Sequence, residues 1–478
     1  MSTMRFDAAD APRPNFTLPT SSHMLRRIGT SWQIAILAAL ATYFLVWPVW
    51  RLAFPIEIDL NEGFNAYLAD AAMGAGPLYP PPDTLALNNY PPLSFYVVGG
   101  LAQIFGDPLY VGRVLSLLAV VALGILIAAA IRQLGGGRAG AAVGGLWFVA
   151  IMARSFSRYV GMDDPQVVGH ALMMAALVWF LIRQAHGRSP VPAILAMAAA
   201  GFYKHNIVAV PVTALAWLAV NDWRRAVAPA VIGAGAAALG FAACVAIYGD
   251  AFLANFFTPR VHETMRAVYA LGRAQFILPA LVLWGIWLAA EPRSPAARFT
   301  MLFVATGFAA FVIQSAGDGV DDNAQFDLVI ATAVGLGVAF DRAGQTAFGR
   351  RHGAVAAQAV VVLVVALRLI ATLRIEPALV LFDPDYRAAY VTNAQLVRNE
   401  AARVAEIPGP VVCGSRLVCR LAGKPFSFDP FRANTMVKTG ASGGLDVEGL
   451  IRAHGMTRFP GDPRQGIQAL YRSIAGKP

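Results

Sequence analysis

The sequence predicts an all-α polytopic membrane protein of about eleven transmembrane helices with a small C-terminal periplasmic α/β domain. The first observation is composition, because 57% of the 478 residues are hydrophobic and 14% are charged. Soluble domains average about 45–50% apolar and about 25% charged residues. The second is a series of apolar runs of spanning or near-spanning length. The third is that every second gap between these runs is rich in arginine.

Eleven apolar runs occupy most of the chain between residues 31 and 374. The fifth and sixth are short and flank Lys204, so they form either a tight helical hairpin or one long broken helix. A single span here would invert every later loop and place arginine-rich gaps outside, so the charge pattern favours eleven spans over ten. The approximate limits are 31–50, 110–131, 139–156, 165–182, 190–203, 206–220, 226–248, 274–290, 298–315, 325–341 and 354–374.

The arginine-rich gaps also orient the chain. Arg26 and Arg27 precede the first run, and Arg224 and Arg225 follow the sixth. Because positively charged loops stay in the cytoplasm, we expect a cytoplasmic N-terminus and a tail outside. These gaps account for the net charge of +10, and without a matching motif no nucleic acid is expected as a partner. The predicted parts are a cytoplasmic segment 1–30, a membrane module 31–374 with an outer loop 51–109, and a tail 375–478.

The tail shows mixed helix and strand signals. Residues 392–407 have helical spacing, a Gly-Pro pair at 409–410 ends that run, and residues 411–413 indicate a short strand. We therefore expect a small α/β domain. Cys413 and Cys419 lie six positions apart in it. If the tail is outside the cytoplasm, a disulfide and two free thiols both remain open.

The gap after the first run carries three carboxylates, Glu57, Asp59 and Glu62. Such a group can supply a general base or hold a divalent cation, whereas the plain alternative is a solvated acidic loop. We expect Asp59 to be the base. Glu57 stands between two isoleucines, and Glu62 opens an amphipathic helix whose dipole it stabilises. Asp59 has no such structural role to explain it.

Other gaps on the same predicted side carry basic groups. Lys204 and His205 lie at the edge of two runs, and Arg260 and Arg266 follow the seventh run. Such cations can hold an anionic group, and charges at a membrane edge are functional candidates. For Lys204 the alternative is an ammonium that extends to the lipid headgroups.

An acidic pair, Asp163 and Asp164, stands immediately before Pro165, which is a favourable position for a helix to begin. Capping of that helix explains one acid, and we expect it to be Asp164. Asp163 is then left for chemistry or for a cation.

Several short motifs are more informative in combination than singly. The outer loop contains Asp59-x-x-Glu62-Gly63-Phe64-Asn65-Ala66-Tyr67 and then Asn89-Tyr90-Pro91-Pro92-Leu93. With the stretches 157–165, 204–206 and 318–323, and with 422–425 and 429–431 of the tail, they resemble the GT-C superfamily of membrane glycosyltransferases. The resemblance is to bacterial relatives of protein O-mannosyltransferases, the aminoarabinose transferase of lipid A and rhizobial lipopolysaccharide galacturonosyltransferases. One departure is the acid spacing, because family members often carry an adjacent Asp-Glu pair.

The resemblance implies a sugar donor linked to polyprenyl phosphate and a reaction at the outer face of the bacterial cytoplasmic membrane. The favoured hypothesis is an inverting transfer to a hydroxyl of a glycan, lipid or protein acceptor. No cofactor is certain, and a divalent cation with unknown ligands is left open. A transporter or lipid flippase is the alternative, although transporters place ionisable groups near the midplane and these acids lie at the ends of spans. The expected site comprises catalytic Asp59, Glu62 and Asp163, phosphate ligands Lys204, His205, Arg260 and Arg266, and substrate-loop residues Glu57, Asn89, Tyr90, Asp164, His262, Asp318 and Asp321.

Overall fold

The computed structural model describes residues 21–461, so that 1–20 of the predicted cytoplasmic segment and 462–478 of the tail lie outside the described residues. Each predicted apolar run coincides with a helix. The sixth and seventh runs share one helix, α8, whose backbone leaves helical geometry at Asp222 (φ −162°, ψ 104°). These helices are α1 (Ser21–Arg51), α4 (Pro108–Gln133), α5 (Arg138–Ser155), α6 (Pro165–Ala185), α7 (Val191–Gly201), α8 (Ala209–Phe256), α10 (Leu278–Ala290), α11 (Pro295–Ser315), α12 (Phe326–Asp341) and α14 (Ala354–Ile370).

Several of these helices are long and apolar enough to cross a membrane. Within the described residues six meet that test, namely those beginning at residues 31, 108, 165, 209, 295 and 322. A seventh span results if the pair 264–276 and 278–290, bent by 80°, is taken as one. The apolar helices at 93–105, 191–201 and 354–370 are shorter. The protein is therefore a multi-pass membrane protein by length and composition, and the count of eleven stays a prediction.

Helix α12 forms the centre of the bundle. Nearly all of its apolar window is buried, and it packs against α5, α10 and α11. The approach to α5 is close because small residues face each other, as a Cβ at Gly140 would lie 2.2 Å from the carbonyl oxygen of Gly337. Helices in lipid associate through such small-residue contacts. The bundle thus provides a rigid frame for the loops at its ends.

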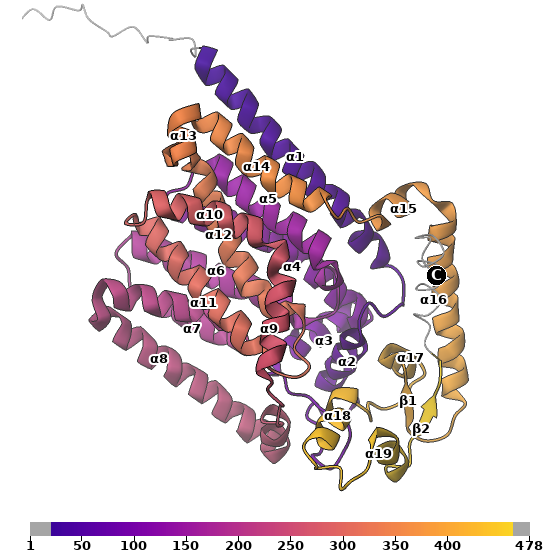
Figure 1. Ribbon diagram of the computed structural model, residues 1–478. Coiled ribbons are helices and arrows are strands. Elements are labelled where there is room, and N and C mark those ends of the chain that lie inside the picture. The colour runs from indigo at the N-terminus through magenta and orange to yellow at the C-terminus, as the bar shows by residue number, and fades with distance from the viewer. Residues whose placement is uncertain (1–20, 462–478) are drawn as a thin grey trace, which may run out of the picture.

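The loops with the predicted site residues gather at one end of the bundle, at the bottom of Figure 1. Helices α2 (Leu60–Asp70), α3 (Leu93–Phe105) and α9 (Thr264–Arg273) lie there. The short helical segments η1 (Ala71–Ala75), η2 (Ser157–Tyr159), η3 (Ala274–Phe276) and η4 (Asp322–Gln325) follow or precede the neighbouring helices in the chain. At the opposite end are η5 (Ala343–Gln345) and α13 (Ala347–His352). Residues 202–208 form a non-helical turn between α7 and α8, which pack against each other. The hairpin reading of this region is therefore confirmed.

The tail is a small α/β unit at the same end (Figure 1). The predicted strand is β1 (Val411–Cys413), which pairs in parallel with β2 (Thr457–Phe459). The helix predicted at 392–407 overlaps α16 (Pro384–Ala405), which ends two residues earlier. The remaining helices are α15 (Glu376–Phe382), α17 (Arg416–Leu421), α18 (Pro430–Lys438) and α19 (Val447–Ala453).

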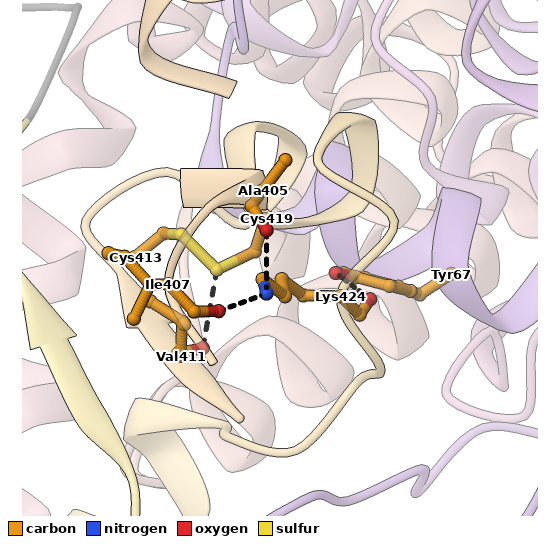
Figure 2. Close-up of a disulfide and its surroundings, with 7 residues drawn as sticks. All are labelled: Tyr67, Ala405, Ile407, Val411, Cys413, Cys419 and Lys424. Carbon is orange, nitrogen blue, oxygen red and sulfur yellow. Dashed lines mark hydrogen bonds between the residues drawn. A yellow bond between two sulfur atoms is a disulfide. The ribbon is translucent and has the colours of Figure 1, made fainter. Parts of the chain in front are cut away.

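Contacts of α17 and the turn after it fix the tail against the membrane module, and a disulfide fixes α17 within the tail. Cys413 and Cys419 form a disulfide that joins β1 to α17 (Figure 2), which settles the question left open by the sequence. Helix α17 packs on α2, and Arg420 pairs with Asp70 at 2.7 Å and with Asp107 at 2.9 Å. Tyr67 of α2 also donates a hydrogen bond to the backbone oxygen of Lys424, drawn in Figure 2. Helix α2 is therefore covered by protein on the tail side.

Candidate active site

Asp59 stands at the start of α2. Its Oδ1 accepts a hydrogen bond from the backbone N–H of Asn61 at 3.1 Å, so the side chain caps the helix. The expectation that Asp59 has no structural role is therefore wrong, because a carboxylate at an N-cap satisfies an otherwise unpaired N–H group. Its Oδ2 accepts from Nη1 of Arg158 at 3.2 Å, and the side chain is 22% exposed. The carboxylate is thus oriented by two contacts and remains accessible.

Arg158 connects three loops. Besides Asp59, its guanidinium pairs with Asp321 and lies 4.0 Å from Asp322. Arg273 of α9 contacts Asp322 at 3.1 Å and Asp321 at 3.9 Å. Asp59 and Asp321 are therefore brought together as expected, although the sequence reasoning did not select Arg158. In the sequence, Arg158 was indicated only by its position in the stretch 157–165, shortly before the acidic pair at 163–164.

Glu62 makes a buried ion pair with Arg113. Both side chains are fully buried, with 2.8 Å between Nε and Oε1 and 2.7 Å between Nη2 and Oε2. The backbone N–H groups of Ile58 and Asp163 also donate to Glu62, at 2.6 and 3.1 Å. This enclosure gives Glu62 a structural part and leaves no room for an acceptor hydroxyl. Arg113 was missed, although an arginine inside an apolar run is a signal in itself.

Asp163 and Asp164 are both buried behind this pair. Asp164 accepts from the backbone N–H of Gln166 at 2.8 Å and caps α6, as predicted. Within the described residues, Oδ2 of Asp163 has no hydrogen-bond partner. Burial raises the pKa of the Asp163 carboxyl well above its usual range, and the negative charges of Glu62 and Asp164 add to this. The environment of Asp163 therefore disfavours its charged form.

Lys204 is buried in the turn between α7 and α8. Its Nζ lies 3.4 Å from the centre of the Tyr90 ring, a cation–π contact. Within the part of the chain that the structure describes, the ammonium makes no hydrogen bond or ion pair with another side chain. Burial raises the pKa of Asp164, and the positive charge of Lys204 opposes that rise. A buried cation with free donors is therefore present at the site end of the bundle.

His205 lies between Tyr90 and Phe256, with ring centres 6.3 and 5.2 Å apart. Partial loss of water around the ring and the positive charges of Lys204 and Arg260 lower the pKa of His205, although its side chain remains exposed. Its imidazole is therefore neutral near pH 7 and keeps one N–H to donate.

Arg260 and Arg266 differ in their surroundings. Arg260 lies over the Phe431 ring at 5.2 Å, and burial lowers its pKa. Arg266 is held by Asp318 at 2.8 Å, so its charge is compensated. Exposed His262 contacts the backbone oxygen of Arg260 at 3.0 Å. Arg260 is therefore the better placed of the two arginines for an anionic ligand.

Two predicted substrate-loop residues remain. Oε1 of the buried Glu57 accepts from the backbone N–H of Gly63 at 3.0 Å, inside the contact between α2 and α17. Asn89 is partly exposed beside Tyr90. No cluster of three or more His, Cys, Asp or Glu side chains suited to a metal occurs among residues 31–461. The divalent cation stays a prediction.

An apolar cavity of about 430 Å³ lies beside the Lys204 turn. Among the described residues that line it, His205 is the one with a polar side chain, and the rest of the wall comes mainly from α7 and α8. The bulkiest lining residues are Phe202, Phe241, Phe252 and Phe256. A hydrocarbon chain would fit such a wall, since the cavity offers almost nothing to a polar ligand.

Comparisons with known proteins agree with this architecture. The chain is similar to ArnT from Cupriavidus metallidurans in the apo state, with a TM-score of 0.57 and 16% identity over 88% of this chain and 90% of that chain. For the same protein bound to undecaprenyl phosphate the TM-score is 0.56, with 15% identity over 88% and 91%. The family model for dolichyl-phosphate-mannose-protein mannosyltransferase matches residues 89–248. The chain has the fold of the GT-C membrane glycosyltransferases. No curated protein sequence matches it.

The match to the family model takes in several of the loops that meet at this end. The matched region 89–248 begins in the first loop and includes the acidic pair and the Lys204 turn. The resemblance inferred from short motifs is therefore confirmed at the level of the fold.

Proposed function

We propose that this protein is an inverting glycosyltransferase that uses a polyprenyl-phosphate sugar at the outer face of the bacterial cytoplasmic membrane. The observation that supports it most is the buried Lys204 side chain, whose ammonium lies over the Tyr90 ring and makes no hydrogen bond or ion pair within the described residues. A buried charge is costly unless it is paired. A lipid phosphate would pair with this ammonium, and the N–H of neutral His205 would add a hydrogen bond. Arg260 would assist from its place near His205.

The apolar cavity supports the lipid part of this donor. It begins at the Lys204 turn and extends between α7 and α8, so a phosphate at Lys204 would have its hydrocarbon chain next to apolar walls. One solved structure of similar fold, ArnT, is bound to undecaprenyl phosphate. This geometry favours a donor with a charged phosphate and a long apolar chain over a water-soluble sugar nucleotide.

The proposed reaction uses Asp59 as the base. It takes the proton of the acceptor hydroxyl, whose oxygen forms a bond with the anomeric carbon. The bond between that carbon and the phosphate oxygen breaks, and polyprenyl phosphate leaves with its charge held by Lys204. Attack from the face opposite the leaving group inverts the anomeric configuration. Catalysis of this type depends on positioning and on charge stabilisation.

Binding of undecaprenyl phosphate to the purified protein in nanodiscs tests the phosphate site. We expect Lys204→Gln to weaken affinity at least about tenfold, because charge-assisted hydrogen bonds are lost. Lys438→Gln is the matched control, since Lys438 is an exposed lysine at the same end that pairs with Asp318. Equal affinity of the Lys204→Gln variant and the wild type would contradict the phosphate site.

Turnover tests the reaction itself. The substrates are undecaprenyl phosphates that carry a neutral hexose, a uronic acid or an amino sugar, and the readout is release of undecaprenyl phosphate in the presence of bacterial envelope acceptors. Release from one class of donor supports the transferase. Binding without turnover of any donor would instead favour a lipid transporter.

A further inference from the structure

The strongest unassigned contact at the site end is the one between Arg158 and two acids from different loops. Nη1 contacts Oδ2 of Asp59 at 3.2 Å, and Nη2 pairs with Oδ2 of Asp321. The planar guanidinium has donors on separate nitrogens and can hold two carboxylates at a fixed angle. A lysine ammonium lacks that fixed geometry.

The backbone around Arg158 is itself held in place. The buried Arg51 donates from Nη2 to the backbone oxygens of Ser157, Arg158 and Val160, at 2.5, 3.2 and 3.0 Å. The hydroxyl of Tyr159 donates to Asp321 at 3.3 Å. The Arg158 side chain therefore extends from a fixed turn and joins Asp59 to a second fixed carboxylate.

We propose that Arg158 is a positioning residue that holds the Asp59 carboxylate in the orientation needed for proton transfer, by tying it to Asp321. This inference rests on the proposed function, in which Asp59 is the base. The two oxygens of a carboxylate offer about four lone-pair sites. The Asn61 N–H and Arg158 occupy two of them, which leaves sites for an acceptor hydroxyl.

The solvent exposure of the Arg158–Asp59 pair distinguishes a positioning role from a purely structural one. The Arg158 and Asp59 side chains are 39% and 22% exposed, whereas Arg113 and Glu62 are both 0% exposed. Exposed ion pairs contribute little to folding stability. Loss of Arg158 should therefore leave the protein folded and should appear in the rate of the chemical step.

The test compares Arg158→Met, Arg158→Lys, Asp59→Asn and the double variant Asp59→Asn/Arg158→Met, with donor turnover and undecaprenyl-phosphate affinity as readouts. We expect Arg158→Met to lower kcat about tenfold or more, because small misplacements of a catalytic group are costly. Donor KM and undecaprenyl-phosphate affinity should stay within about twofold, and Arg158→Lys should recover part of the loss. In the Asp59→Asn background the Arg158→Met change should cost less than about twofold, because the two residues act as one unit.

Two further variants keep the test decisive. Arg273→Met is the matched control, because Arg273 contacts Asp321 and Asp322 but not Asp59; its kcat should stay near that of the wild type. Asp321→Asn releases the other end of the guanidinium and should lower kcat in the same direction as Arg158→Met. It replaces Arg158→Met as the probe if that variant fails to fold.

The outcomes distinguish this inference from the proposed function. A slow Asp59→Asn variant beside a normal Arg158→Met variant overturns only the inference. If the effects of the two changes multiply fully, the residues act independently and the inference is also overturned. A raised donor KM with unchanged kcat overturns it too, and makes Arg158 a donor ligand instead. A fully active Asp59→Asn variant contradicts the proposed base itself.

Discussion

The Glu62 carboxylate and the Arg113 guanidinium form a two-point ion pair in which both side chains are completely buried. Arg113 also donates to the backbone oxygens of Leu52, Phe54 and Ile56. One side chain of α4 thereby fixes the whole entry to α2, including the segment that carries Asp59.

Replacement of Glu62 by Gln should therefore destabilise the protein. Removal of one partner from a buried ion pair costs about 3–5 kcal/mol, because the other charge stays buried and uncompensated. Thermal unfolding in detergent measures this loss. Glu448→Gln is the control, because Glu448 and Arg458 form an exposed pair and should contribute about 0–1 kcal/mol. A stable Glu62→Gln variant that lost only its rate would return Glu62 to the catalytic group.

Asp59→Asn should leave the fold intact and lower kcat at least about a hundredfold, because removal of a positioned base typically costs about 10²–10⁴ in rate. Asparagine caps a helix about as well as aspartate, so α2 keeps its N-cap and only the basic group is lost. Asp446→Asn makes the same change at the N-cap of α19 and should leave kcat unchanged. Release of undecaprenyl phosphate from its sugar-linked form is the measurement, and a normal rate for Asp59→Asn would exclude it as the base.

Gly112→Ala should disrupt the packing behind the site. A Cβ at Gly112 would lie 1.8 Å from Oδ1 of Asp163, a separation that no side chain can adopt without movement. Overpacking of this kind costs about 1–3 kcal/mol. Gly100→Ala in α3 is the control, because nothing lies within 4 Å of its added Cβ. A helical alanine there should be neutral or stabilising by about 0.5–1 kcal/mol. Equal unfolding temperatures of both variants would contradict the close contact.

The disulfide provides a test of topology. If the tail is outside the cytoplasm, Cys413 and Cys419 should be oxidised in cells, because the periplasm permits disulfides. A denatured, unreduced sample should then react with maleimide-polyethylene glycol only at Cys244, and a reduced sample at all three cysteines. Three reactive thiols without reductant would place the tail in the cytoplasm. The Cys413→Ser/Cys419→Ser variant should lose about 2 kcal/mol of stability, as expected for so short a loop.

Local sequence patterns were sufficient for the helices and for some of their ends. Apolar runs predict the spans because lipid allows only structures that satisfy their own backbone hydrogen bonds. Asp164 before Pro165 predicts the start of α6 for a local reason, since the cap and the helix are adjacent. The same kind of reasoning failed for Asp59, because the helix that it caps was expected to begin near Glu62.

Long-range partners could not be predicted. Arg113 and Glu62 are 51 positions apart, and Arg158 and Asp321 are 163 positions apart. Nothing local in either sequence segment specifies its partner, because the pairing is created when the bundle brings the loops to one end. The choice between a disulfide and free thiols depended in the same way on how β1 and α17 are placed.

The contact between Arg416 and the backbone oxygen of Leu60 joins residues that are 356 positions apart. At about 5–20 residues per second, a ribosome needs roughly 20–70 s to make the chain between them. Helix α2 therefore emerges early and lacks its contact with α17 while the spans between them are inserted. The cover over α2 is completed only at the end of synthesis. Chains that stop before α17 should consequently be inactive and open to proteolysis at the first loop.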